Sequence, residues 1–286
     1  MSRRNNQDRV GAPHPDSEPP PAAMDKAQDD FLSFVTPTEF VELPSGGKHY
    51  AEDSPLYKAE SIELRHMTAK EEDILTSQSL LRKGLVIDRL LESLLVDRRI
   101  LVNDLLIGDK NALLVAARKT GFGNLYITNV ACPQCSVVSE QEFDLDTVEL
   151  DEACHRLPEE VTDQGGGIYA LTIPGLKVCV EVRLLTSADE MRLVAAKERK
   201  RKLKLPESNY TDNLKSIIVS VEGRQDAASV DKLLEVMPLR DAAHIMKIYQ
   251  KVVPSVNSEQ LFSCDSCSFE GGIELPFTAD FFWPDT

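Results

Sequence analysis

Two short stretches, Cys132-Pro133-Gln134-Cys135 and Cys264-Asp265-Ser266-Cys267, decide how this chain is interpreted. Each lies between strand-like segments, and together they offer four thiolates, the ligand set of a closed tetrahedral zinc site. The two-residue gap in a zinc knuckle lets turn amides point at the sulfurs while both thiolates reach one ion. We therefore predict one structural Zn²⁺ per chain, bound by Cys132, Cys135, Cys264 and Cys267.

The long segment between the two pairs sets the predicted architecture. Cys135 and Cys264 are separated by 128 residues, far more than in an ordinary zinc ribbon. Such an insertion is tolerated because the entropic cost of closing a loop rises only slowly with its length. We predict two zinc-knuckle (zinc-ribbon-like) β-hairpins with a helical subdomain, at about 186–254, inserted between them.

Other interpretations of the cysteine pairs remain open. An iron–sulfur cluster takes the same thiolate ligands. A redox-active Cys-x-x-Cys normally opens a helix after a strand, a context that neither pair has. The pairs can also be local turns that share no metal. Disulfides are disfavoured because the N-terminus lacks the apolar core of a secretion signal.

Composition and motifs narrow the class of function. The chain has 286 residues, a net charge of −15 and a pI near 4.8. This acidity argues against a general nucleic-acid binder, which normally has a basic face. No apolar run reaches the length of a membrane span, so no membrane partner is expected. No nucleophile elbow, H-E-x-x-H or dinucleotide motif occurs, so we expect neither an enzyme nor a small-molecule substrate.

The chain divides into three predicted regions. Residues 1–35 are rich in proline and scattered charges, which predicts a disordered tail. Residues 36–122 should form strands near Phe40 and Ile62, then a helix that starts at the capping box Thr68-Ala69-Lys70-Glu71. Residues 123–286 should form the ribbon-like domain with its insertion. The mixed order of strands and helices predicts the α+β class.

Helical periodicity adds detail to this division. One apolar stripe at helical spacing should be buried: Ile87, Leu90, Leu91, Leu94 and Leu95. Asp109 is expected to cap the next helix, which should end at Thr120-Gly121. The inserted helices are expected from Thr186 or Ser187 to about Lys204, from Asp226 to Val236 and from Leu239 to Val253.

Two surface features suggest partner contacts. Arg199, Lys200, Arg201 and Lys202 form a basic run in an acidic chain, which predicts either a solvated helix end or a docking patch. Phe277, Phe281, Phe282 and Trp283 crowd near the C-terminus. These aromatic residues predict either an internal latch or an interface anchor, with Phe281, Phe282 and Trp283 as the anchoring residues.

Two cysteines fall outside the pairs. Cys154, next to His155, has no partner at ligand spacing, so we expect no metal there. Cys179 lies in a predicted strand, where we expect it to be a packing residue.

Longer motifs resemble those of a known family. They are Leu43-Pro44-Ser45, Tyr50-Ala51-Glu52-Asp53-Ser54-Pro55-Leu56, Met67-Thr68-Ala69-Lys70-Glu71-Glu72-Asp73-Ile74-Leu75, Leu105-Leu106-Ile107-Gly108-Asp109-Lys110-Asn111-Ala112 and Pro276-Phe277-Thr278-Ala279-Asp280-Phe281-Phe282-Trp283-Pro284. From about Phe40 to Pro284 the chain resembles the baseplate hub subunit family of T4-like contractile-tailed bacteriophages. The resemblance carries over no catalytic residue.

This resemblance implies a setting and a class of partner. It implies a structural subunit or assembly factor of the baseplate central hub, assembled in the host bacterial cytoplasm and located in the virion tail. The implied partners are other hub or tail proteins. Two alternatives remain: a transient tail-assembly chaperone absent from the mature particle, and a zinc-ribbon nucleic-acid-binding protein.

Overall fold

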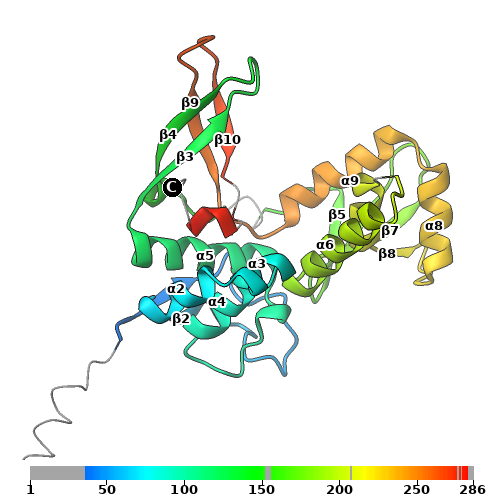
Figure 1. Ribbon diagram of the computed structural model, residues 1–286. Helices are drawn as coiled ribbons and strands as arrows, with labels where there is room; N and C mark the ends of the chain where they lie inside the picture. The colour runs from blue at the N-terminus through cyan, green and yellow to red at the C-terminus, as the bar shows by residue number, and fades with distance from the viewer. Residues whose placement is uncertain (1–35, 152–155, 207, 276, 278, 283–286) are drawn as a thin grey trace, which may run out of the picture. The chain divides into compact units, whose positions relative to one another are not determined.

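Local capping signals place the first elements of the fold (Figure 1). The computed structural model describes residues 36–151, 156–206, 208–275, 277 and 279–282. Two paired strands and three helices come first: β1 (Thr38–Glu42), β2 (Ser61–Arg65), α2 (Ala69–Leu75), α3 (Gln78–Lys83) and α4 (Val86–Leu94). The predicted capping box is confirmed, because the Glu71 carboxylate accepts a hydrogen bond from the Thr68 amide at 2.8 Å. Gly84 ends α3 with a φ of 68°, in the left-handed region that favours glycine.

The predicted apolar stripe of α4 is buried. Leu90, Leu91 and Leu94 have no exposed surface, Leu95 is 2% exposed, and Ile87 is partly buried against them. These side chains belong to one core that extends through β2, α5 and the sheet of the insertion. The prediction that this stripe is buried is thus confirmed, because apolar residues repeating at the 3.6-residue period of a helix lie on one face of it.

α5 (Ile107–Phe122) differs from its prediction at both ends. Its N-cap residue is Leu106, so the prediction that Asp109 caps the helix is wrong. Asp109 is instead buried, and its carboxylate accepts hydrogen bonds from the Ser45 hydroxyl at 2.6 Å and the Tyr50 hydroxyl at 2.5 Å. Burial raises the pKa of Asp109 even though these donors act to lower it. The helix ends at Phe122 with Gly123 as its C-cap, beyond the predicted Thr120-Gly121.

The insertion between the cysteine pairs contains a four-stranded antiparallel sheet as well as helices. The strand order is β5-β6-β7-β8. The elements are β5 (Val161–Gly165), β6 (Ile168–Thr172), β7 (Cys179–Arg183), α6 (Ser187–Lys202), α7 (Asn209–Ile217), β8 (Ile218–Val221), α8 (Ala227–Val236) and α9 (Leu239–Val252). Because β8 lies inside 186–254, the prediction of a purely helical inserted subdomain is corrected to a mixed one. The α+β class is confirmed.

Both ends of the α6–α9 segment return to the start of α5. Before α6, the Ser187 amide donates to the Leu105 carbonyl at 2.8 Å, and the Ile107 amide donates to the Leu185 carbonyl at 3.2 Å. After α9, the chain passes so close to Gly108 that a Cβ there would lie 1.8 Å from the carbonyl oxygen of Pro254. Only glycine fits at this crossing. Backbone contacts on both sides of the α6–α9 segment therefore join it to the start of α5.

The start of α6 depends on one buried carboxylate. Thr186 and Asp189 form a capping box, in which the Thr186 amide donates to Asp189 at 3.0 Å. Arg183 donates twice to the same carboxylate, at 2.7 and 2.8 Å. Burial raises the pKa of Asp189, but these donors outweigh it and lower the pKa to about 2. The ionised carboxylate therefore stabilises the folded state.

Replacing this carboxylate gives a pH-dependent prediction. Because the folded pKa is depressed below the ordinary value near ~4, the stabilisation is complete above about pH 4 and is lost as the pH falls toward 2. Asp189→Asn should lower the free energy of unfolding by about 2 kcal/mol at pH 7. Urea denaturation at several pH values should show the difference from wild type shrinking in acid. A difference that is constant from pH 7 to pH 3 would contradict this account.

The chain divides into two units. Pro37–Thr286 clusters as one compact unit apart from Met1–Thr36, and the predicted tail 1–35 lies outside the described residues. Within the described part of the chain, no helix is both long and apolar enough to cross a membrane.

Candidate metal centre

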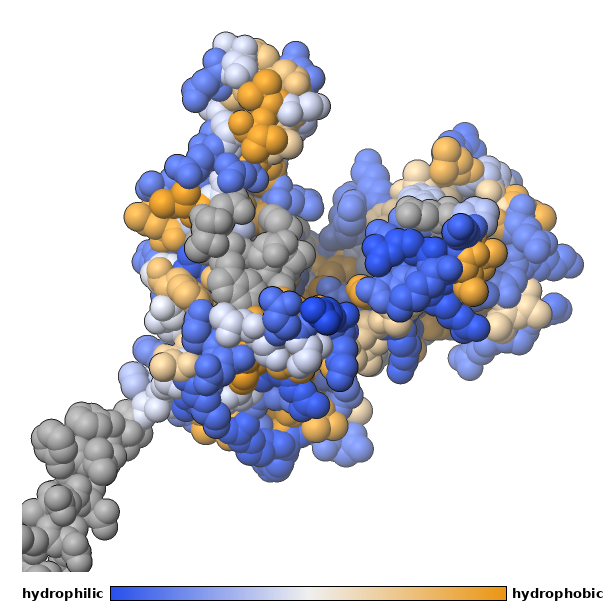
Figure 2. Space-filling model, viewed as in Figure 1, coloured by the Kyte–Doolittle hydropathy of each residue, from blue (hydrophilic) through white to orange (hydrophobic). Residues whose placement is uncertain are grey.

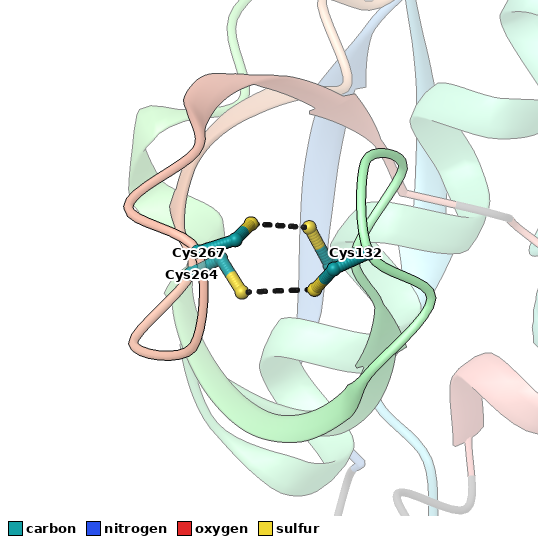
Figure 3. A group of neighbouring side chains, drawn as sticks. Cys132, Cys264 and Cys267 are labelled. Carbon is teal, nitrogen blue, oxygen red and sulfur yellow. Dashed lines mark hydrogen bonds between the residues drawn. The ribbon is translucent and has the colours of Figure 1, made fainter.

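Two β-hairpins bring the four predicted ligands together. β3 (Leu125–Ala131) pairs with β4 (Val138–Asp144), and the turn between them holds Cys132 and Cys135. β9 (Glu259–Ser263) pairs with β10 (Glu270–Glu274), and the turn between them holds Cys264 and Cys267. Figure 3 shows the two turns facing each other with the sulfurs between them. The strand-turn-strand setting predicted for each pair is therefore present.

The two turns have the same backbone geometry. In each, the amide of the residue after the second cysteine donates to the carbonyl of the first, Ser136 to Cys132 and Ser268 to Cys264, at 2.9 Å in both cases. Both serines adopt left-handed conformations, with φ values of 60° and 54°. Sequence analysis overlooked these serines, although a serine directly follows each Cys-x-x-Cys pair. Their conformation closes each turn so that its two thiols face the same side.

The sulfur positions fit a single tetrahedral ion. The Sγ atoms of Cys132 and Cys267 are 3.6 Å apart, and those of Cys135 and Cys264 are 3.7 Å apart (Figure 3). All four sulfurs lie within 4.8 Å of one another. Zn–S bonds of about 2.3 Å imply sulfur–sulfur edges of about 3.8 Å in a tetrahedron. A disulfide would need about 2.05 Å, so the four cysteines are free thiols placed as a ligand set.

The turn amides and the crowding of thiols act on the sulfurs in opposite directions. Burial raises the pKa of Cys132, but hydrogen bonds from the amides of Cys135 and Gln134 outweigh this and lower it to about 6. The Phe269 amide acts to lower the pKa of Cys267, but burial and the three neighbouring thiols raise it to about 12. Four thiolates this close repel one another strongly. A divalent cation would relieve that repulsion and deprotonate the remaining thiols.

A small apolar cluster surrounds the thiols. Cys132, Cys264 and Phe262 are 2 to 3% exposed and form a cluster separate from the main core. Phe269 and Ile273 pack against it as partly buried neighbours. This cluster shields the sulfurs from water, yet it contains few apolar side chains. The junction between the hairpin tips therefore has little hydrophobic stabilisation of its own, and a metal would supply much of what holds it together.

The chemistry open to this arrangement is structural. Four protein sulfurs complete a tetrahedral coordination shell, so no position remains for water or a substrate. The residues present thus fit a closed metal site and offer no open Lewis-acid position.

The predicted aromatic anchor is placed inside the chain instead. Phe281 and Phe282 are 0% and 1% exposed, in the short 3₁₀ helix η4 (Ala279–Phe282). The Phe281 ring packs on Tyr126 with a centroid distance of 5.0 Å, and its carbonyl accepts from Arg118 Nε at 3.1 Å. These contacts correct the interface prediction for Phe281 and Phe282, because buried rings are unavailable to a partner. They form the internal latch that was the alternative, while Trp283 lies outside the described residues.

The predicted basic run lies at the end of α6. Arg199, Arg201 and Lys202 are exposed. Lys200 is half-buried and pairs with Asp212 of α7 at 2.6 Å. Lys200 therefore ties two helices together, whereas its neighbours face solvent.

The other predicted cysteines stay apart from this centre. Cys179 lies in a strand as predicted, at the start of β7, but it is an exposed free thiol, so the prediction that it is a packing residue is wrong. It faces away from the buried residues Val180 and Val182 that follow it along the strand. Cys154 and His155 lie outside the described residues.

Comparison with known proteins gives one match. A family model described as T4 bacteriophage base plate protein matches residues 36–283, which is most of the chain. No curated protein and no solved structure matches the chain.

Proposed function

Because this chain belongs to the T4 bacteriophage base plate protein family, we propose that it is a non-catalytic structural subunit of the central hub of a contractile-tail baseplate. The family match over residues 36–283 is the observation that carries this proposal. The closed four-cysteine group supports a role in holding shape, since such a site leaves no position for chemistry.

The metal we propose for this centre is Zn²⁺, held by the two hairpin turns as a pair of zinc knuckles. Its ligands would be Cys132, Cys135, Cys264 and Cys267, whose sulfurs lie at separations suited to Zn–S bonds. Zinc has no redox chemistry and would serve to fix the hairpins relative to each other. An iron–sulfur cluster is the competing occupant of the same ligand set.

The surface of the hairpins supports contact with other proteins. Several large apolar side chains of these strands are exposed: Leu125 (54%), Ile127 (42%), Val138 (61%) and Leu261 (92%). Figure 2 shows hydrophobic surface on this part of the molecule. Exposed apolar patches often mark sites of protein association. We propose other baseplate hub or tail proteins as the partners, and the acidic charge disfavours nucleic acid.

Analysis of purified phage particles tests this role. We expect the chain to remain in particles that have been banded and washed in high salt, at a copy number fixed relative to other tail proteins. Quantitative mass spectrometry of those particles would measure this ratio. A soluble host protein added before purification serves as the control for carry-over. If the chain occurs in infected-cell lysates but not in particles, the protein is a transient assembly chaperone and the subunit proposal fails.

A further inference from the structure

A groove runs along the exposed side of α6. One hollow of about 510 Å³ lies between α6 and the α3–α4 region. A second hollow of about 490 Å³ continues along α6 and shares Ala195 and Glu198 with the first. The first hollow has apolar lining on both sides, from Leu81, Leu85 and Ile87 on one and from Met191 and Val194 on the other. The second hollow is lined by α6 and by Leu203, which follows it. Val194 is 52% exposed and Leu203 is 59% exposed, so apolar surface is open to solvent along the groove.

The floor of the groove is rigid and internally neutralised. Lys110 is buried and forms ion pairs with Asp88 and Glu190, each at 2.9 Å. It also donates to the Ser187 hydroxyl at 2.9 Å. These contacts fix α4, α5 and α6 relative to one another, so the walls are already in place before any partner binds. The buried ammonium group of Lys110 is therefore already paired within the protein.

The rim of the groove is basic. α6 carries six basic and three acidic residues, whereas the whole chain has a net charge of −15. Arg82 and Lys83 end α3 on one side of the groove, and Arg199 lies on α6 on the other. Within the part of the chain described by the structure, none of these three forms an ion pair. Figure 2 shows this end of α6 as strongly hydrophilic surface with hydrophobic patches beside it.

We propose that this groove binds an acidic amphipathic helix of another protein. Apolar side chains at helical spacing would fill the hollow, and carboxylates on the helix flanks would face the unpaired cations of the rim. From Met191 to Leu203 the groove follows α6 and its C-cap over about 18 Å, which accommodates about three turns of a bound helix. Nucleic acid is disfavoured because much of the groove lining is apolar and offers little contact to a phosphate backbone.

Binding of synthetic helices to the full-length protein tests the proposal. The probe is a fluorescein-labelled, side-chain-stapled peptide of eighteen residues with Leu at i, i+3, i+4 and i+7 and Glu on both flanks. One comparison peptide has Lys in place of Glu, and another has Gln in place of Leu. Fluorescence anisotropy should show the acidic amphipathic peptide binding at least tenfold more tightly than either comparison. Equal binding of the Lys peptide would overturn the proposal.

Matched variants locate the binding site. Val194→Asp should weaken binding of the acidic peptide at least tenfold, and so should the double change Arg199→Glu with Lys202→Glu. Val236→Asp provides the apolar control, because Val236 is 62% exposed on α8, away from the groove. The control for the double charge reversal is Lys247→Glu with Lys251→Glu, which changes two exposed residues of α9. Both controls should bind as the wild type does, and equal losses in groove and control variants would rule out the site.

A second copy of the chain is the competing occupant. Sedimentation velocity of the protein alone should show no association that depends on the groove. A dimer that dissociates with Val194→Asp would instead mean that another copy fills the groove, and the proposal of a foreign acidic helix would be rejected.

Discussion

Cys264→Ser should reduce bound zinc from one ion per chain to nearly none. Cys264 is buried between the hairpin tips, 3.7 Å from the sulfur of Cys135, and a hydroxyl is a much poorer ligand for Zn²⁺ than a thiolate. Metal binding in small zinc domains contributes on the order of 10 kcal/mol gross. The small apolar cluster at the tips offers little to replace it. Elemental analysis by mass spectrometry would measure the metal, and proteolysis would report loosening of the hairpins.

Cys179→Ser is the matched control for this experiment. Cys179 is a free exposed thiol outside the four-cysteine group, so its loss should leave zinc content and protease resistance unchanged. Acidification should release zinc from the wild type, because protons compete with the metal for thiolates. If the purified protein instead contains stoichiometric iron with labile sulfide, an iron–sulfur cluster and not zinc occupies the same four cysteines. Protein purified without any bound metal and folded normally would refute metal ligation altogether.

Leu91→Asp should lower the free energy of unfolding by about 4 kcal/mol or more, close to the limit of what a domain of ordinary stability survives. Leu91 has no exposed surface and lies in the middle of α4, within the continuous core. A carboxylate there would be desolvated among the apolar side chains of this stripe. Thermal and urea denaturation of the zinc-loaded protein, followed by circular dichroism, would measure the loss.

Arg89→Asp tests whether the effect comes from burial or from placing aspartate in this helix. Arg89 lies two residues earlier in α4, and its exposed side chain pairs with Glu92 at 2.7 Å. Surface pairs of this kind contribute about 0 to 1 kcal/mol, so the control should unfold nearly as the wild type does. Wild-type stability of Leu91→Asp would show that this stripe does not form part of the core.

Signals confined to a few neighbouring residues were readable from the sequence. Thr68 with Glu71 was predicted as a capping box and forms one, and Thr186, one of the two residues predicted to start the next long helix, caps α6. The apolar stripe through Leu91 follows from one helical period. The cysteine pairs were recognisable because each Cys-x-x-Cys sits in its own hairpin turn. In these cases the interaction that matters lies within a single element or turn.

The features that sequence analysis missed depend on residues far apart in the chain. Asp109 looked like a helix cap, but its true partners, Ser45 and Tyr50, precede it by 64 and 59 residues. Phe281 looked available to a partner, yet it is covered by Tyr126 and Arg118 of distant segments. The β5-β6 hairpin was hidden because its glycine-rich turn reads as an unstructured loop. Only tertiary packing distinguishes these alternatives.

The placement of the cysteines also determines how tension would pass along the folded backbone. With zinc across the hairpin tips, a pull between the segments before Cys132 and after Cys267 is borne by the metal–sulfur bonds. The 128 residues between Cys135 and Cys264 lie outside this path. The insertion among them is held by backbone contacts beside α5 and by the ion pairs of Lys110 with Asp88 and Glu190. A subunit built in this way would keep its neighbours at a fixed separation while the α6 surface, held against α4 and α5, stays available to another protein.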